Sequence, residues 1–306
     1  MTGRLAVAVG GGTGLPLVLR LMIRAGFDTS AVVTVADDGG SSGALRRELG
    51  MLPPGDIRNC LVALAEPGNP WAPLFQYRFS RGAGLEGHAL GNLVIAALAE
   101  TEGGFAEAVA AAGRLLGARG RVLPSTLADV VLSGRDAEGR VVTGQANVAV
   151  SDGPVVHACL EPAAPEPYPP ALDALRTADV IVIGPGSLFT SIIPNFLVDG
   201  IADAVRESRA RRIYVCNVAN QRGETAGFDA ADHLQALARH GLGGCIDTVL
   251  VSVSDGGRAS EVAAGAVQIA RIEAMGPRVV TADLTSAADP HRHDPDRLYA
   301  ALAGVW

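Results

Sequence analysis

The sequence predicts an α/β fold with a Rossmann-like, doubly wound and mostly parallel sheet. The first observation is a strand, turn, helix and strand in order: an apolar run at 5–9, glycines at 10–14, an apolar helix at 15–25 and a second apolar run at 31–35. Such a βαβ unit requires parallel strands and a right-handed crossover. The second observation is that this alternation returns after residue 170. We therefore expect a single α/β domain over 1–306.

The segments between these two parts differ in residue composition and in the secondary structure that they predict. Alanine- and leucine-rich segments at 57–65, 87–101 and 105–116 predict helices. From about 121 to 161, short β-type runs are separated by turn residues, which predicts a small antiparallel insertion instead of an independent domain. These runs are 130–132, 141–143, 147–150 and 155–158.

The second half repeats strand and helix signals. Apolar runs predict strands at 179–183, 212–216, 248–252 and 279–282. The intervening helices are expected at 197–208 and 230–240, and Asp294-Pro295 provides a cap and first residue for a last helix at 296–302.

Composition excludes several classes of protein. All 25 basic residues are arginine, so a Schiff-base lysine, a G-x-x-x-x-G-K-[ST] phosphate loop and a kinase-type lysine are excluded. The net charge is −7 without a polybasic run, which argues against nucleic-acid binding. Four scattered cysteines suit a reducing compartment. With no signal-peptide pattern and no apolar stretch of about 18 residues, we expect a cytoplasmic protein without a membrane span.

The most informative segment is 36–43, Ala-Asp-Asp-Gly-Gly-Ser-Ser-Gly, which directly follows the second apolar run. Glycines let backbone N–H groups approach a ligand, and carboxylates hold a ribose, a metal ion or a proton. A plain β-turn at Asp38-Gly39 is the alternative. The candidate site residues here are Asp37, Asp38, Gly39, Gly40, Ser41 and Ser42.

A second glycine-rich turn lies between the first strand and its helix. Gly11, Gly12, Thr13 and Gly14 stand where a helix amino terminus accepts a phosphate. Leu15 replaces the last glycine of a strict G-x-G-x-x-G pattern, so a purely structural turn is the alternative.

Two helix starts carry polar side chains on otherwise apolar helices. Asp56, Arg58 and Asn59 suit an anion or metal site, although a capping aspartate with solvated neighbours explains them too. His88 and Asn92 are four residues apart on one helical face, as a ligand pair or as a satisfied structural histidine.

Further loops follow the strands of the second half. Gly186, Ser187 and Thr190 form a candidate ligand turn, because the segment lacks the G-x-S-x-G pattern of a serine hydrolase. Asn217 closes the next strand in the same style. Open α/β sheets bind ligands at these strand ends. The segment 291–294, His-Arg-His-Asp, reads as a solvated loop before the last helix.

Taken together, these strings resemble the gluconeogenesis factor family, a branch of the fold shared with the 2-phospho-L-lactate transferases (CofD-like). The motifs are the glycine turn at 10–14, Val-Ala-Asp-Asp-Gly-Gly-Ser-Ser-Gly at 35–43, 52–60, Gly-His-x-x-Gly-Asn at 87–92, and 184–195, which adds Asn195. The resemblance covers residues 5–253. The Gly-Gly-Ser-Ser-Gly continuation resembles the factor branch and not the transferases.

The resemblance implies a cytoplasmic protein that binds a nucleotide sugar, typically UDP-N-acetylglucosamine; a dinucleotide is the alternative ligand. It implies a regulator of cell shape and wall synthesis during gluconeogenic growth, a homo-oligomer, and a partner protein from wall synthesis. The alternative is a Mg²⁺-dependent transferase of phospholactyl type acting on a nucleotide-activated substrate. By similarity, its metal carboxylates fall on the Asp37–Asp38 pair and Asp56, and Asp38 with Asp56 is the expected metal pair. An NAD-dependent dehydrogenase is not supported, because no hydride-transfer constellation is evident.

One segment departs from the family pattern. Residues 217–225 read Asn-Val-Ala-Asn-Gln-Arg-Gly-Glu-Thr, where the family usually has Asn-Val-Met-Thr-Gln-Pro-Gly-Glu-Thr. The change at Ala219, Asn220 and Arg222 leaves the base and sugar preference of the ligand open, as well as the question of catalysis.

Overall fold

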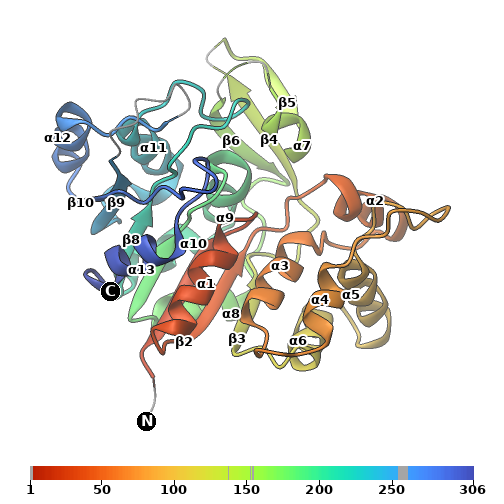
Figure 1. The fold of residues 1–306 in the computed structure, drawn as a ribbon. Coiled ribbons are helices and arrows are strands. Elements are labelled where there is room, and N and C mark those ends of the chain that lie inside the picture. Colours follow the sequence, from red (N-terminus) through yellow and green to blue (C-terminus); the bar gives the residue numbers. More distant parts are fainter. Residues whose placement is uncertain (1–2, 137, 152, 154, 254–260) are drawn as a thin grey trace.

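The computed structural model describes residues 3–136, 138–151, 153, 155–253 and 261–306. A parallel sheet is formed by β1 (Leu5–Gly10), β2 (Asp28–Val33), β3 (Gly120–Pro124), β7 (Val180–Ile183), β8 (Arg211–Val215), β9 (Thr248–Ser252) and β10 (Arg278–Ala282). Its seven strands run in the order β10-β9-β8-β7-β1-β2-β3 (Figure 1). The predicted α/β class and doubly wound topology are confirmed.

A second, three-stranded sheet stands beside the first. It contains β4 (Val131–Asp136), β5 (Val141–Thr143) and β6 (Val155–Glu161), paired antiparallel in the order β5-β4-β6. The predicted antiparallel insertion is therefore present. The strand predicted at 147–150 is wrong, because this segment lies largely in the short helix α7 (Gln145–Ala149). Residues 120–124 belong to the main sheet as β3, paired in parallel with β2.

Helices cover both faces of the main sheet, as expected for buried parallel strands. One face packs against α1 (Leu15–Arg24), α3 (Gly55–Leu64), α4 (Trp71–Gln76), α5 (Leu90–Thr101), α6 (Phe105–Leu115) and α13 (Pro295–Ala303). The other packs against α8 (Pro169–Thr177), the π-helical turn η1 (Leu188–Ile192), α9 (Ile193–Phe196), α10 (Ile201–Glu207), α11 (Ala230–Leu237), the π-helical turn η2 (Ala238–Leu242) and α12 (Ala266–Ala274). The alternation of β1 shows the two cores: Ala6 and Ala8 face the first group, and Val7 and Val9 the second.

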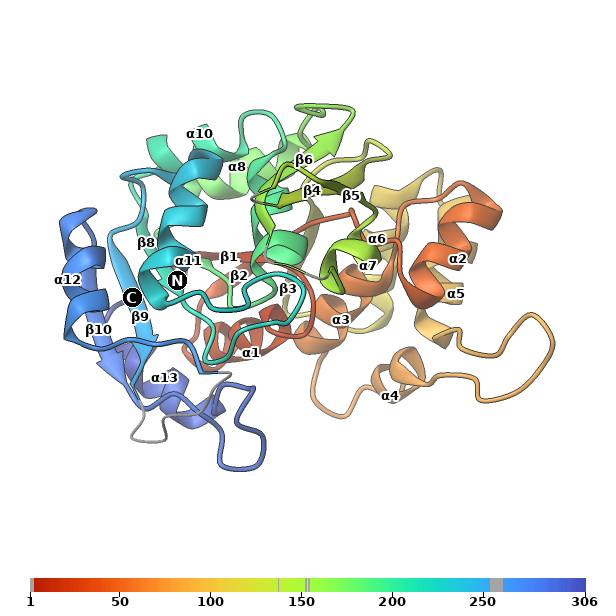
Figure 2. The same ribbon diagram turned by 90° about the horizontal axis from the view of Figure 1, so that it is seen from above.

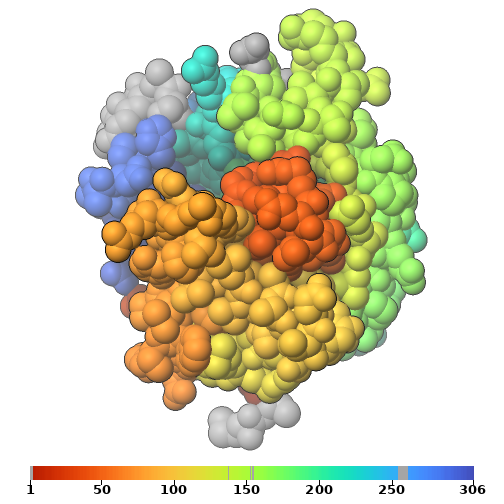
Figure 3. All heavy atoms as spheres, turned by 90° about the vertical axis from the view of Figure 1, so that its right-hand side faces the viewer, coloured from red at the N-terminus to blue at the C-terminus, as the bar shows by residue number. Residues whose placement is uncertain are grey.

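The helix α2 (Gly40–Leu49) begins inside the Asp-Asp-Gly-Gly-Ser-Ser-Gly segment. Gly40, Ser41 and Ser42 therefore form a first helical turn, although the sequence predicted a loop there. In space, α2 lies between the small sheet and the α4–α6 segment, where Figure 3 shows it as the orange-red patch at the centre of that face.

The apolar helices do not resemble membrane spans when taken singly. Within the described ranges, no individual helix combines the length and apolar composition needed to cross a bilayer; one bent pair, Leu188–Phe196 with Ile201–Glu207, meets the criteria of length and composition jointly.

The strand order places a topological switch point between the neighbours β1 and β7. From there the chain winds outward in opposite directions, through β2 and β3 on one side and β8, β9 and β10 on the other. In such sheets the connections diverge at the switch point and leave a crevice above the carboxyl ends of the strands. The polar loops predicted from the sequence lie at these ends.

Candidate nucleotide site

The glycine turn after β1 packs directly against the turn after β7. An added side-chain carbon at Gly14 would overlap the carbonyl oxygen of Pro185, and one at Gly186 would lie 3.3 Å from the carbonyl oxygen of Gly11. Glycine is required here because two backbones approach without room for a Cβ atom. The structure thus brings together two turns that lie about 170 residues apart in the sequence.

Asn217, after β8, fixes the β7 turn. Its Nδ2 donates to the carbonyl oxygen of Gly186 over 2.8 Å, and its Oδ1 accepts from the amide of Gly186 at 3.2 Å. The residues predicted separately as Gly186 and Asn217 therefore form one unit. Because both backbone groups of Gly186 are committed, this pair shapes the wall and does not itself offer free donors.

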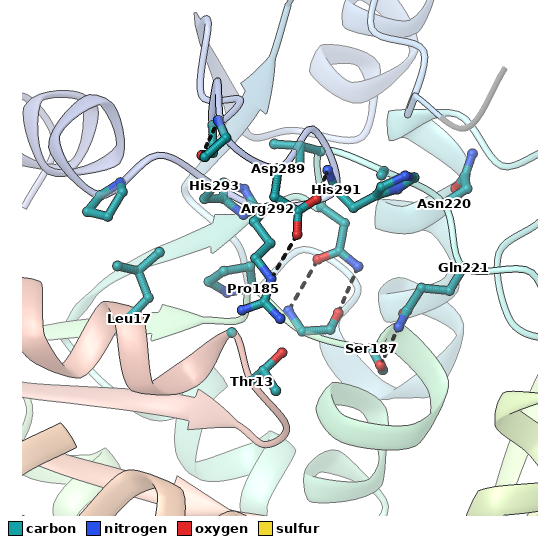
Figure 4. A pocket seen from close by; sticks show the side chains of 18 of the residues that line it. Thr13, Leu17, Pro185, Ser187, Asn220, Gln221, Asp289, His291, Arg292 and His293 are labelled. Atoms are coloured by element: carbon teal, nitrogen blue, oxygen red, sulfur yellow. Dashed lines mark hydrogen bonds and ion pairs between the residues drawn. The ribbon is translucent and has the colours of Figure 1, made fainter. Parts of the chain in front are cut away.

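A pocket of about 650 Å³ opens where these turns meet (Figure 4). Three strand-end segments contribute to it, from the β1, β7 and β8 turns, and a fourth wall comes from the C-terminal segment before α13. The rim carries Arg20, His291 and Arg292, so it is basic in a chain of net charge −7. Nε of Arg292 lies 3.1 Å from Oδ2 of Asp289. The lining includes Thr13, Gly14, Pro185, Gly186, Ser187, Asn217, Asn220 and Gln221.

The segment 291–294 is thus more than the solvated loop read from the sequence. Nε2 of His293 donates to the carbonyl oxygen of Cys216 at 3.0 Å, which joins the C-terminal segment to the end of β8. Burial lowers the pKa of His293 to about 4, so this imidazole is neutral at pH 7 and holds the wall as a hydrogen-bond donor.

A buried glutamate missing from the predicted set organises the β7 loop. Glu224 accepts from the amides of Phe189 and Thr190 at 2.9 and 3.1 Å and from the hydroxyl of Thr190 at 2.7 Å. Burial raises its pKa, and these hydrogen bonds act in the opposite direction. The amide and hydroxyl donors of the predicted residue Thr190 are therefore both bonded to Glu224 and are not free for a ligand. The Gly-Glu-Thr string at 223–225, which follows the end of β8, is the sequence feature that contains this glutamate.

Ser187 and Gln221 connect the same two loops. Nε2 of Gln221 donates to Oγ of Ser187 at 2.7 Å, and both residues line the pocket. Oε1 of Gln221 is buried without a partner among the described residues.

Asp56 lies beneath the glycine turn of β1. Its Oδ2 accepts the amide N–H of Gly12 at 2.7 Å, and a Cβ at Gly11 would come within 2.6 Å of the same oxygen. Burial raises the pKa of Asp56 to about 6, with a further contribution from the charge of Asp37. The turn therefore holds a carboxylate that titrates near neutrality.

Asp37 is the carboxylate that lies close to Asp56. It accepts the amide of Gly39 at 3.0 Å, and Ser42 also donates to it. Oγ of Ser42 accepts the amide of Gly55 at 3.1 Å, so the start of α2 is bonded to the start of α3. Burial raises the pKa of Asp37, as expected for a carboxyl partly withdrawn from water beside other acids.

Asp38 points elsewhere. Its oxygens accept the amides of Gln145 and Ala146 at 3.0 and 2.8 Å, at the amino end of α7. Figure 2 shows α7 on the side of the small sheet that faces α2. The predicted metal pair, Asp38 with Asp56, is therefore not brought together by these contacts, whereas Asp37 and Asp56 are.

Ser41, His88 and Asn92 form a buried hydrogen-bonded cluster. Oγ of Ser41 accepts from Nδ2 of Asn92 at 3.0 Å and from the amide of Ala89 at 3.4 Å, and lies 3.1 Å from Nδ1 of His88. With both lone pairs of the serine used, its hydroxyl proton points to the imidazole. The cluster connects the first turns of α2 and α5 and leaves this serine without a free group for a ligand.

The remaining predicted residues are divided between rim and core. Thr13 is exposed at the pocket. Arg58 is buried and donates to the carbonyl oxygen of Phe75 and to Oε1 of Gln76, while Oδ1 of Asn59 accepts from Nε2 of Gln76 at 3.4 Å. Asn195 is fully buried and donates to the carbonyl oxygen of Gly10, so it holds the end of β1.

The donor set allows a magnesium ion but no closed metal cage. Among the described residues, no cluster of three or more histidine, cysteine, aspartate or glutamate side chains could hold a metal. Mg²⁺ commonly uses one or two carboxylates and completes its shell with water and substrate phosphates. Asp37 and Asp56 fit that pattern, because they are two neighbouring carboxylates whose pKa values are raised chiefly by burial, although Arg46 and Arg58 act in the opposite direction.

Comparison with known proteins gives a consistent result. Residues 6–285 match the family model described as "2-phospho-L-lactate transferase CofD". The chain is 47% identical over 245 residues to the gluconeogenesis factor of Halalkalibacterium halodurans, a match covering 80% of this chain and 76% of that protein. The gluconeogenesis factor of Bacillus subtilis is 47% identical over 246 residues, covering 80% and 78%.

Two further matches set the limits of the comparison. A relative from Nostoc sp. is 51% identical over 246 residues, but these are only 54% of its length. A crystal structure from Bacillus halodurans, whose title places the protein in the UPF0052 family, superposes with a TM-score of 0.92 at 40% identity and covers 99% of both chains.

Proposed function

Because the chain belongs to the family of the 2-phospho-L-lactate transferase CofD, we propose that it is a nucleotide-sugar-binding regulatory factor of the gluconeogenesis-factor type. UDP-N-acetylglucosamine is the proposed ligand. In this proposal the protein acts in the cytoplasm as a homo-oligomer. It changes cell shape and wall synthesis under gluconeogenic growth through a partner protein.

The observation that supports this proposal most is the pocket at the switch point. Gly14 and Gly186 line it without side chains at the amino end of α1, where the helix dipole favours a diphosphate. Arg20 on the rim offers a guanidinium group to such a diphosphate, and Arg292, which is paired with Asp289, adds further N–H donors. A pocket of about 650 Å³ is within the usual range for a small-molecule ligand.

The pocket wall favours binding over turnover. Its one carboxylate among the described lining residues, Asp289, is paired with Arg292. His293 has its Nε2 hydrogen bonded to Cys216 and a pKa of about 4, which makes it a weak base at pH 7. The side chains that line the pocket would therefore bind the ligand and would not act as general bases towards it.

The second candidate function is the Mg²⁺-dependent transferase, and one observation favours it. The Asp37–Asp56 pair borders the glycine turn, where its negative charge would repel a diphosphate unless a cation intervened. When bound, Mg²⁺ would supply charge neutralisation at the diphosphate.

A thermal-shift titration with product analysis separates the two functions. For the regulator, UDP-N-acetylglucosamine raises the melting temperature and is recovered unchanged, because a ligand that binds only the folded state stabilises it. Release of a nucleotide from a phospholactyl-nucleotide, with a deazaflavin acceptor, would instead establish the transferase. The Arg20→Gln/Arg292→Gln variant should lose most of the thermal shift, and an unchanged shift would count against this pocket.

Two matched variants test whether Mg²⁺ binds beside Asp56. Asp37→Asn removes a carboxylate beside Asp56, whereas Asp38→Asn alters a neighbouring carboxylate that caps α7. If Mg²⁺ strengthens UDP-N-acetylglucosamine binding, Asp37→Asn should abolish that strengthening and Asp38→Asn should retain it. The reverse result would return the metal to the pair predicted from the sequence, Asp38 and Asp56.

A further inference from the structure

A second hollow lies at the amino ends of the strands, opposite the carboxyl ends where the nucleotide pocket lies. It measures about 580 Å³ and is bordered by residues at the start of β8, β9 and β10 and directly before the start of β1 and β7. Five arginines and two aspartates line it. The arginines are Arg4, Arg209, Arg211, Arg212 and Arg278, and the aspartates are Asp179 and Asp247.

The two carboxylates are already engaged. Oδ2 of Asp179 accepts the amide of Leu5 at 2.7 Å. Asp247 forms a bidentate pair with Arg212, over 2.7 Å to Nη2 and 3.0 Å to Nε, and also accepts the amide of Arg212. This pair raises the pKa of Arg212. Among the arginines of the hollow, only Arg212 is therefore ion-paired with one of these two aspartates.

The other four arginines have little or no anionic contact. Nη1 of Arg211 donates to the carbonyl oxygen of Val305 at 2.8 Å, and the guanidinium of Arg4 lies over the ring of Phe27 at 5.3 Å. Arg209 and Arg278 are exposed, and their side chains form no hydrogen bond or ion pair with the described residues. Several like charges thus face one hollow in a chain whose net charge is −7.

Guanidinium groups around a concave surface recognise phosphate oxygens by paired N–H donors. Two formal negative charges against five positive ones leave a surplus of three in the lining. We propose that this hollow binds a small soluble anion carrying two or more linked phosphate groups. The size of the hollow favours such a molecule over an extended polyanion.

A structural role for these arginines makes a different prediction. Arg209 follows the carboxyl end of α10, where a cation offsets the helix dipole. In that case the arginines would affect stability, but no anion would bind at a defined stoichiometry. Calorimetry with inorganic pyrophosphate and orthophosphate distinguishes the two roles.

The experiment uses the full chain, a double variant of the hollow, Arg209→Gln/Arg278→Gln, and a charge-matched control, Arg176→Gln/Arg239→Gln, at exposed arginines outside the hollow. With the rim arginines of the nucleotide pocket removed by Arg20→Gln/Arg292→Gln, we expect one pyrophosphate per chain, bound about tenfold more tightly than orthophosphate. The hollow variant should lose about tenfold or more in affinity, and the control should stay within about twofold. Thermal unfolding confirms that all variants are folded.

Three results would overturn the proposal. One is the absence of pyrophosphate binding to the wild-type chain. Another is unchanged binding in the hollow variant with loss in Arg20→Gln/Arg292→Gln, which would place the anion in the nucleotide pocket. The third is binding of phosphatidylglycerol vesicles through Arg209 and Arg278 without competition by pyrophosphate, which would make this edge a membrane-facing surface. None of these results affects the proposed nucleotide-sugar ligand, which is tested separately.

Discussion

The amide N–H of Gly12 donates to the carboxylate of Asp56 across 2.7 Å, which joins the turn after β1 to the first turn of α3. The donor lies where a diphosphate is proposed to bind, so an acid already occupies one of the donors of the turn. The charge state of Asp56 therefore bears on both stability and ligand binding.

The first prediction concerns the pH dependence of stability. The pKa of Asp56 is about 6 in the folded protein, against an ordinary value of 3.8, so the ionised form opposes folding above pH 6. Asp56→Asn keeps an oxygen acceptor for Gly12 and removes the charge. We expect the variant to be more stable than wild type at pH 7.5, by at most about 3 kcal/mol.

The sign of this difference follows from the order of the two pKa values. As the pH falls from 6 to 4, the folded wild-type protein takes up a proton before the unfolded chain does, and the advantage of the variant vanishes. Urea unfolding of both proteins across pH 4–8 without divalent metal measures it. A constant difference over this range would contradict the raised pKa.

The second prediction tests the contact between the two turns. Gly14→Ala would force the turn after β1 away from Pro185, because the added carbon overlaps backbone and not a flexible side chain. We expect a loss of about 2–3 kcal/mol in stability and no detectable ligand binding. Gly113→Ala, inside α6, meets only ordinary contacts of 3.6 Å or more and should be neutral or slightly stabilising. Equal effects of the two changes would refute the close approach.

The third prediction separates hydrogen bonding from charge at Glu224. Glu224→Gln retains an oxygen for the amides of Phe189 and Thr190, and its NH₂ group can donate to the hydroxyl of Thr190. We expect a loss of about 1 kcal/mol for Gln and about 3 kcal/mol or more for Ala, which leaves two buried amides unsatisfied. Denaturant unfolding measures both. Indistinguishable losses would show that the charge, and not the bonds, is required.

The fourth prediction concerns the serine pair at the start of α2. Ser41→Ala removes the acceptor of Asn92 and Ala89 and the partner of His88, and should cost about 2–3 kcal/mol. Ligand affinity should change less than about threefold, because Ser41 has no free group for a ligand. A large loss of affinity with unchanged stability would move Ser41 from the supporting cluster into the binding surface.

Local patterns sufficed for the elements built from short-range signals. The run at 5–9, the glycines after it and the apolar helix became β1, the turn and α1 within one residue at each boundary. The predicted N-cap of the last helix, α13, is also present, since Asp294 accepts the amides of Asp296 and Arg297. These features depend on residues that are close together in the sequence, so the sequence alone is enough to predict them.

Long-range contacts account for what the sequence did not reveal. Whether Asp37 or Asp38 lies beside Asp56 depends on α7, which is about 107 residues from Asp38 in the chain. The same holds for the pocket wall at Arg292, because its placement requires His293 to reach the end of β8. The segment 147–150 looked like a strand by composition, and its capping by Asp38 helps to make it helical.

Consecutive residues Asp37 and Asp38 serve two separate regions of the molecule. The first carboxylate lies close to Asp56 beneath the glycine turn of β1, and the second holds the small β-sheet through α7. A shift of the backbone at this one peptide would be transmitted to both. A ligand that displaces Asp37 would therefore also displace Asp38, and with it α7 and the small sheet, without any movement of domains.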